Sequence, residues 1–273
     1  MVRRAILLAV RMPLTPLMIE MRTMKTFLAL NCLWIAAPGC GGGSDGDDGC
    51  GGGDIETVRE YFALARGASW TYDNVDYRAT PELETTLEKT IRSDCETVTF
   101  DDCVSGEARE HSCYVQETMG GAADAEDANL LYMELNGDGL VRVQQDHLTG
   151  AKKTQRETYS PYFMRLVAGP YSQGDLCEFT HERCEYVGDA APIRSTKRYR
   201  HEVVSTDESV TVPSDTYTGV LHIKRTDLGD GKTKDFWYAR GVGKIKEEGK
   251  LATGMLVSSE ALVAFEAGSG GCE

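Results

Sequence analysis

The sequence predicts a mainly β domain of antiparallel strands that follows an export signal and a flexible tether. Three observations lead to this fold class: β-favouring runs alternate with turn signals, helical patterns of comparable length are absent after residue 65, and cysteines are frequent. Strands in such an order form meanders that curl or close to protect their edges. Residues 54–267 are expected to form one domain, within the usual size for a single hydrophobic core.

An export signal is expected over residues 1–39. Arg22 and Lys25 flank the start of an apolar run of 11 residues, Phe27–Ala37, whereas a membrane-spanning helix needs about 20. A basic segment, a short apolar run and a small residue at the cleavage point are typical of a secretory signal, which is removed. Two later methionines are alternative starts, because a signal from the first residue has an unusually long basic segment: Met21 and Met24.

The end of this signal predicts lipid attachment at Cys40. Gly39 before Cys40 matches the ending of a lipoprotein signal, although Ala37 stands where leucine is usual. The tripeptide 37–39 suits the ordinary signal peptidase poorly, because proline occupies its middle. Residues 40–53 are acidic and glycine-rich and should form a flexible tether. We expect an anchor outside the cytoplasm, at an outer membrane or cell surface rather than an inner membrane; plain secretion and a retained membrane anchor are the alternatives.

The charge of the chain argues against nucleic acid as a partner. The sequence holds 29 basic and 43 acidic residues, of which the first 40 residues contain five and one. The remainder therefore keeps 24 and 42, a net charge near −18. A surface of this sign repels a phosphate backbone.

Seven cysteines follow Cys40, which is ordinary for a protein in an oxidising compartment. An odd number leaves at least one thiol without a partner in the chain, and the connectivity stays open. Cys50 with Cys272 is one hypothesis, because this pair would join the two ends of the domain. Cys177 with Cys184 is another, as a staple within a local hairpin. The candidate disulfide residues are Cys50, Cys95, Cys103, Cys113, Cys177, Cys184 and Cys272.

The domain begins with helical spacing and continues as strands to a glycine-rich tail at residues 268–273. Four apolar residues share one helical face within residues 54–65, which predicts a short helix or an irregular lead-in: Ile55, Val58, Tyr61 and Phe62. A strand is expected at Trp70–Tyr72, after the turn-like residues 66–69, and the last strand at Met255–Phe265.

A first hairpin is expected around Asn136–Gly139. Its Asn-Gly pair is a strong turn signal between the β-favouring runs Leu130–Glu134 and Leu140–Val143. A weak internal repeat relates Leu64-x-x-Gly67-x-x-Trp70-x-Tyr72 to Tyr171-x-x-Gly174-x-x-Cys177-x-Phe179, and chance is the alternative explanation.

A second hairpin is expected around Gly229–Gly231, between Thr218–Arg225 and Lys234–Tyr238. Within the first of these runs, Leu221 and Ile223 alternate with polar residues. Such alternation is typical of an antiparallel strand with one solvated face.

Three segments in order carry recognisable motifs. Residues 61–72 are similar to YFPLxxGxxWxY, residues 210–217 to VxVPAGTF with Ser214-Asp215 in place of Ala-Gly, and residues 236–246 to YWYAxGVGxVK. Together they resemble a widespread and mostly uncharacterised family of Gram-negative lipoproteins, over most of residues 60–250. The resemblance implies an antiparallel sheet curved into a half-barrel, as in periplasmic lipoprotein carriers, and brings no catalytic residues.

The motif residues also have a structural interpretation. Pro213 suits a turn or strand edge. Gly241 and Gly243 permit a bend or bulge. Trp70 and Trp237 are large apolar anchors for a core.

Other motifs favour structure over chemistry. Gly231-Lys232-Thr233 lacks the first glycine of a phosphate loop and is interpreted as a hairpin turn. The acidic pairs Asp101-Asp102 and Glu247-Glu248 are expected to be solvated surface. A calcium loop is disfavoured because its last position is not glutamate: Glu134, Asn136, Asp138, Gly139 and Gln145. A zinc site is also disfavoured, because disulfides compete for its thiols. Its candidate ligands are Cys103, His111, Cys113, His181 and Cys184.

These patterns nominate no catalytic residue, cofactor or metal ligand. We therefore expect a non-enzymatic domain, held at a membrane by its lipid, that binds an envelope partner or an apolar ligand. The alternatives are a structural or envelope-assembly spacer and, with less support, a hydrolase of envelope polymers.

Overall fold

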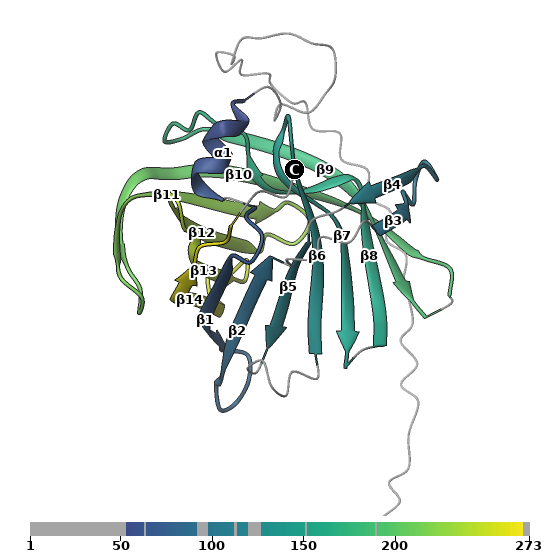
Figure 1. Cartoon of the computed structure of the whole chain (residues 1–273), viewed down its shortest axis with the longest axis horizontal. Coiled ribbons are helices and arrows are strands. Elements are labelled where there is room, and N and C mark those ends of the chain that lie inside the picture. Colours follow the sequence, from purple (N-terminus) through teal and green to yellow (C-terminus); the bar gives the residue numbers. More distant parts are fainter. Residues whose placement is uncertain are drawn as a thin grey trace, which may run out of the picture. The chain divides into compact units, whose positions relative to one another are not determined.

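The computed structural model describes residues 53–62, 64–91, 98–111, 114–119, 127–150, 152–188 and 190–269. Within them a short helix precedes fourteen strands, which confirms the mainly β class (Figure 1). The elements are α1 (Ile55–Tyr61), β1 (Ser69–Asp76), β2 (Leu83–Ile91), β3 (Val98–Asp101), β4 (Ala108–His111), β5 (Tyr114–Met119), β6 (Asp127–Asn136), β7 (Gly139–Thr149), β8 (Lys152–Val167), β9 (Leu176–Val187), β10 (Ile193–Thr211), β11 (Thr216–Asp227), β12 (Thr233–Ala239), β13 (Gly243–Lys250) and β14 (Leu256–Glu266).

Twelve of these strands form one closed antiparallel barrel in the order β1-β14-β13-β12-β11-β10-β9-β8-β7-β6-β5-β2. Closure depends on β1, which pairs with β14 on one side and with β2 on the other. The observed fold is therefore a closed barrel, where the sequence predicted a curved sheet or half-barrel. Because the first and last strands pair, the sheet has no free edge along its circumference.

The expected local elements are present. Asp54 caps α1 by accepting a hydrogen bond from the Glu56 backbone N–H at 3.0 Å. The Asn136 side chain accepts from the Asp138 and Gly139 backbone N–H groups in the β6–β7 turn. Residues 228–232 turn between β11 and β12, as predicted for the Gly-Lys-Thr segment.

The first and third motifs pack against each other, although they lie about 170 residues apart. The Trp70 indole N–H donates to the Val242 carbonyl at 2.6 Å, and the Tyr72 hydroxyl donates to the Lys244 carbonyl at 2.7 Å. Gly243 has a φ of +101°, and a Cβ there would lie 3.4 Å from Phe62 and Trp70. These residues thus have the architectural role expected from their types.

The β10–β11 hairpin carries the second motif and extends beyond its neighbours. β10 pairs with β9 only as far as Glu202, so residues 203–211 pair with β11 alone. At the tip, the Ser214 backbone N–H donates to the Leu262 carbonyl on β14 at 3.0 Å. The Trp237 indole on β12 donates to Glu208 at 2.9 Å. The hairpin is thereby fixed to the C-terminal strands of the barrel.

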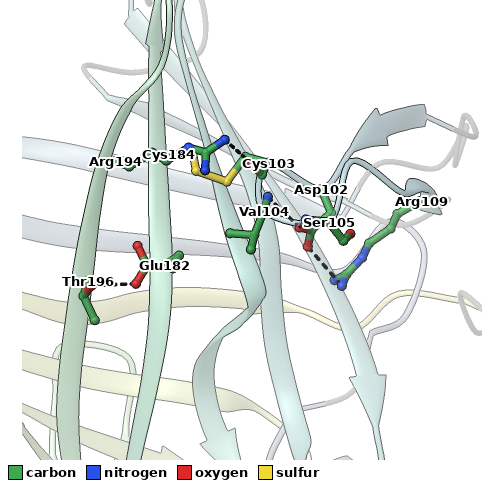
Figure 2. Close-up of a disulfide and its surroundings, with 9 residues drawn as sticks. All are labelled: Asp102, Cys103, Val104, Ser105, Arg109, Glu182, Cys184, Arg194 and Thr196. Atoms are coloured by element: carbon green, nitrogen blue, oxygen red, sulfur yellow. Dashed lines mark hydrogen bonds and ion pairs between the residues drawn. A yellow bond between two sulfur atoms is a disulfide. The ribbon is translucent and has the colours of Figure 1, made fainter.

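The two remaining strands, β3 and β4, form a separate hairpin (Figure 1). In sequence this hairpin lies between β2 and β5, which pair with each other in the barrel. A disulfide between Cys103 in its turn and Cys184 on β9 fixes the hairpin to the barrel (Figure 2). The Arg194 side chain donates to the Cys103 carbonyl at 2.7 Å. Residues 81 positions apart are therefore held together covalently and by hydrogen bonding.

The hypothesis of a Cys177–Cys184 staple is wrong. Both cysteines lie on the single strand β9, and seven residues of extended chain separate them by roughly 23 Å. Cys184 bonds Cys103 instead, and Cys177 is also disulfide-bonded. The other candidate disulfide residues and the lipidation residue lie outside the described residues: Cys40, Cys50, Cys95, Cys113 and Cys272.

The expectation that the acidic pairs are solvated surface is wrong for one member of each. Asp102 is 2% exposed and Glu247 is 5% exposed. Asp102 accepts from the Val104 and Ser105 backbone N–H groups, and Arg109 lies 3.1 Å from it (Figure 2). These hydrogen bonds outweigh burial and lower the pKa of Asp102.

Among the described residues, no helix has both the length and the apolar character needed to cross a membrane. The export signal expected at residues 1–39 lies outside them.

Candidate functional site

Side chains from several strands meet inside the barrel around Phe163 on β8. The guanidinium carbons of Arg142 on β7 and Arg225 on β11 each lie 4.8 Å from the centroid of the Phe163 ring. The Tyr199 ring on β10 packs edge-on against Phe163 with centroids 5.5 Å apart. β9 lies between β8 and β10, so Phe163 reaches Tyr199 and Arg225 across the concave face of the sheet.

Arg225 is a buried cation surrounded by aromatic rings. Its residue is 9% exposed, and its guanidinium also lies 5.3 Å from the Tyr199 ring centroid and 5.1 Å from that of Phe236. Its Nη1 has no hydrogen-bond partner, and Arg225 forms no ion pair with any described residue. Burial, with a smaller effect of Arg165, lowers the pKa of Arg225 to about 10. The side chain therefore stays charged at neutral pH.

Two buried histidines lie beside these arginines. His201 is opposite Arg225 in the β10–β11 register, and neither of its ring nitrogens has a hydrogen-bond partner. His181 stacks on Tyr199, and its Nδ1 is also without a partner. Burial and, to a smaller extent, the nearby arginines lower the pKa of both histidines, that of His181 to about 3. Both rings are neutral at pH 7.

Unpartnered polar atoms in such a place carry an energetic cost. A buried donor or acceptor without a partner costs about 1–3 kcal/mol. Three such atoms occur here: Nη1 of Arg225 and both ring nitrogens of His201. The two residues are paired across the neighbouring strands β10 and β11. Polar groups left in this state inside a barrel indicate a place where a bound molecule or water completes the hydrogen bonds.

Each of these two residues lines a cavity. The Arg225 cavity has a volume of about 370 Å³, and Tyr199, Thr233 and Ser258 contribute hydroxyl groups to its lining. The His201 cavity has a volume of about 170 Å³ and is bounded on one side by Tyr171.

Cations outnumber carboxylates in the lining of the Arg225 cavity. Five of its twelve lining residues are cationic and one, Asp227, is acidic. Four of the cations have carboxylate partners of their own, in the ion pairs Arg78–Asp76, Lys232–Asp230, Lys234–Glu247 and Lys250–Asp235. Among the described lining residues, Arg225 is the cation that forms no ion pair.

A second charged cluster inside the barrel is fully paired and differs from this one. Lys244 lies 2.6 Å from Glu247 and 2.5 Å from Glu260, and Lys89 lies 3.3 Å from Glu260. Burial would lower the pKa of Lys244, but the charges of Glu247 and Glu260 raise it. The cluster links β2, β13 and β14 by balanced charges and has a structural role.

The apolar part of the interior is filled by its own side chains. The cavity between Phe62, Trp70 and Met133 has a volume of about 30 Å³, enough for one or two water molecules. An acyl chain does not fit this space. Two larger cavities border Arg225 and His201.

Residues of the two metal sites that the sequence disfavours have structural partners in the described part of the chain. The thiols of Cys103 and Cys184 form a disulfide, so they are not available to the disfavoured zinc group. No group of three or more potential metal ligands occurs among the described residues. Asn136 and Asp138, from the disfavoured calcium loop, accept hydrogen bonds within the turn and from the Tyr162 hydroxyl.

Sequence reasoning missed the two residues that define the cavities, Arg225 and His201. One signal was available for Arg225. The alternation that points Leu221 and Ile223 inward continues to Arg225 at the next inward position, and β11 is buried at these three positions. An arginine at a core position is unusual and marks a possible site.

Comparison with known proteins finds similar chains only among solved structures. No family model matches the chain, and no curated protein matches its sequence. A structure described as "a putative exported protein with YmcC-like fold" from Bacteroides fragilis has 11% identity and a TM-score of 0.40, covering 76% of this chain and 99% of that chain. "A putative lipoprotein" from Parabacteroides distasonis has 13% identity and a TM-score of 0.38, covering 75% and 97%. No residue role is transferred from either.

Proposed function

We propose that this chain is an exported lipoprotein, anchored through lipid on Cys40, whose barrel is a non-enzymatic domain that binds a small polar ligand. The observation that carries the binding function is the pair Arg225 and His201, whose buried polar atoms lack partners and border cavities. A domain that served only as a folded spacer has no need of such atoms, because they reduce stability.

Export is supported by the disulfide chemistry of the barrel. The Cys103–Cys184 bond joins segments 81 residues apart, and structural disulfides form in oxidising compartments. The basic segment and apolar run before Cys40 supply a route to such a compartment. The proposal places the protein at an outer membrane or cell surface, as a relative of the lipoprotein family that its motifs resemble.

The interior favours a polar ligand over the apolar ligand considered from sequence. The cavity between Phe62, Trp70 and Met133 has only about 30 Å³ of free space, whereas the cavity beside Arg225 has about 370 Å³. Hydrolysis receives no support from His201, the histidine that lines one of these cavities, because neither of its ring nitrogens has a partner that would orient a catalytic base.

Lipid attachment is tested by Cys40→Ala in the full chain, expressed in a Gram-negative host with labelled palmitate. The wild-type protein is expected to incorporate label and to begin at Cys40 in intact-mass measurement. The variant is expected to lose the label and to retain residues 1–39, because lipidation precedes cleavage in this pathway.

Cys32→Ala is the matched control, since Cys32 lies in the segment that the signal peptidase removes. This variant should label as the wild-type protein does. Equal labelling of Cys40→Ala and wild type, or a mature start other than Cys40, contradicts the anchor.

A further inference from the structure

We propose that the Arg225 cavity is an anion site that binds a small organic molecule through a carboxylate or phosphate group. This inference rests on the proposed binding function and names the chemical class of the ligand. It is carried by the position of Arg225, by the charge of the cavity and by the hydroxyl groups around it.

The first argument is the state of the Arg225 side chain. It is 91% buried, lines the cavity, has an unpartnered Nη1 and forms no ion pair with any described residue. Aromatic rings of Phe163, Tyr199 and Phe236 surround it at 4.8–5.3 Å. Ring contacts stabilise the cation through its π faces but do not use the N–H donors in its plane. A carboxylate or phosphate is the group whose geometry matches those donors.

The second argument is charge. The whole chain has 43 acidic and 29 basic residues, yet the cavity lining has five cations and one carboxylate. Composition therefore does not account for the excess of cations. Lys232, Lys234 and Lys250 are paired with carboxylates of their own, so their charges are largely balanced and Arg225 is the cation that supplies the direct contact with an anion.

The third argument is the rest of the lining. Tyr199, Thr233 and Ser258 bring hydroxyl groups, which donate to oxyanions, and Leu251 and Val257 bring apolar surface. A volume of about 370 Å³ exceeds that of one phosphate or carboxylate. The site therefore fits an organic anion with a small body attached to its charged group.

The competing explanation is that Arg225 is purely structural and that its ring contacts suffice. The two explanations differ in what anions do to the protein. A structural arginine gives no saturable response to anions, whereas a binding arginine gives binding heat and a rise in the melting temperature with ligand concentration.

The experiment is isothermal titration calorimetry of the full chain, purified from the cell fraction that contains it and kept at constant ionic strength. The probes are inorganic phosphate and succinate, with sodium chloride as the ionic-strength control. Saturable binding of at least one probe to the wild-type protein is expected, and the stronger of the two identifies the preferred oxyanion. The same probe is expected to raise the melting temperature.

Three variants assign that binding to Arg225. Arg225→Met should weaken binding by roughly tenfold or more, because the charged donors are lost. Arg225→Lys should fold with its charge retained and bind less tightly than wild type, since an ammonium lacks the planar fork. Arg200→Met, on the same sheet but exposed and paired with Glu178, removes an equal charge outside the cavity and should bind as wild type does.

Two outcomes overturn the anion site. One is absence of saturable binding of both probes to the folded wild-type protein. The other is wild-type affinity in Arg225→Lys and Arg225→Met. Failure here is separable from failure of the proposed function, because Cys40 labelling tests the anchor independently, and native mass spectrometry that finds a neutral polar ligand would keep the binding role while rejecting the anion.

Discussion

At the scale of single residues, two buried cations of the barrel, Lys244 and Arg225, are in opposite electrostatic situations. Lys244 lies between Glu247 and Glu260, whereas Arg225 is surrounded by rings and has an unpartnered nitrogen. Burial is nearly complete at both residues, so the difference is in the neighbours. A balanced cation contributes to stability, and an unbalanced one is available to a ligand.

Glu247→Gln is predicted to lower the free energy of unfolding by about 3–5 kcal/mol, because it leaves the buried Lys244 with less balancing charge. Charges of Lys234 and Lys244 outweigh burial and keep the pKa of Glu247 well below its usual range. Urea denaturation at pH 7 measures the change. The control is Glu248→Gln at the adjacent, more exposed position, where a loss below about 1 kcal/mol is expected. Equal losses in the two variants would remove the distinction between these carboxylates.

The candidate site was only partly accessible from sequence. The alternation of buried and more exposed residues along β11 can be predicted from the sequence and extends to Arg225. No local pattern indicates that Phe163, Tyr199 and Phe236 surround this side chain. Those rings come from three other strands. Tyr199 and Phe236 lie on the strands that flank β11, and Phe163 on β8 reaches Arg225 across the curved sheet. A periodic pattern within one strand contains neither the strand order nor the curvature.

At the scale of elements, hairpins were predictable because their signals are local. The Asn136–Gly139 turn and the β11–β12 turn depend on a few adjacent residues. The disulfide pairing was not predictable. Spacing of seven residues favoured a Cys177–Cys184 staple, whereas the continuous strand β9 keeps those residues apart and brings Cys184 to the β3–β4 turn.

Replacing both Cys103 and Cys184 by serine is predicted to destabilise the protein by about 4 kcal/mol, because the unfolded chain regains the freedom of a loop of 81 residues. Hydrogen exchange should also quicken over residues 98–111. Urea denaturation and exchange mass spectrometry measure these effects.

The internal control for this double variant is the tip of the β10–β11 hairpin, residues 207–217. Its exchange should not change, because hydrogen bonds of Ser214 and Trp237 attach it to the barrel independently. Unchanged exchange over residues 98–111 would show that the hairpin does not depend on the disulfide.

At the scale of the whole molecule, closure is the feature that sequence did not specify. β1 and β14 pair residues almost 200 positions apart, such as Trp70 with Phe265. Trp70 belongs to the first sequence motif, but the motif does not indicate its contact with β14. Trp70 packs on Phe62 and Phe265 with ring centroids 5.6 Å apart in both pairs, and donates to Val242.

Trp70→Ala is predicted to cost about 3–5 kcal/mol of stability, because it removes a buried ring and leaves a cavity at the closure. Hydrogen exchange should quicken in both β1 and β14. Thr71→Ala, at the next position of β1 and only half buried, is the matched control and should cost much less. If exchange rises in β1 alone, Trp70 does not hold the closure together.

The closed circumference of the barrel has a further consequence for a protein that a lipid would concentrate on a surface. Molecules confined to two dimensions meet often, and exposed strand edges would then join neighbouring copies into extended sheets. Every barrel strand here has two partners within its own chain, although residues 203–211 of β10 pair with β11 alone. Around the closed part of the barrel, dense packing on a membrane would therefore leave neighbouring copies no open edge through which to join.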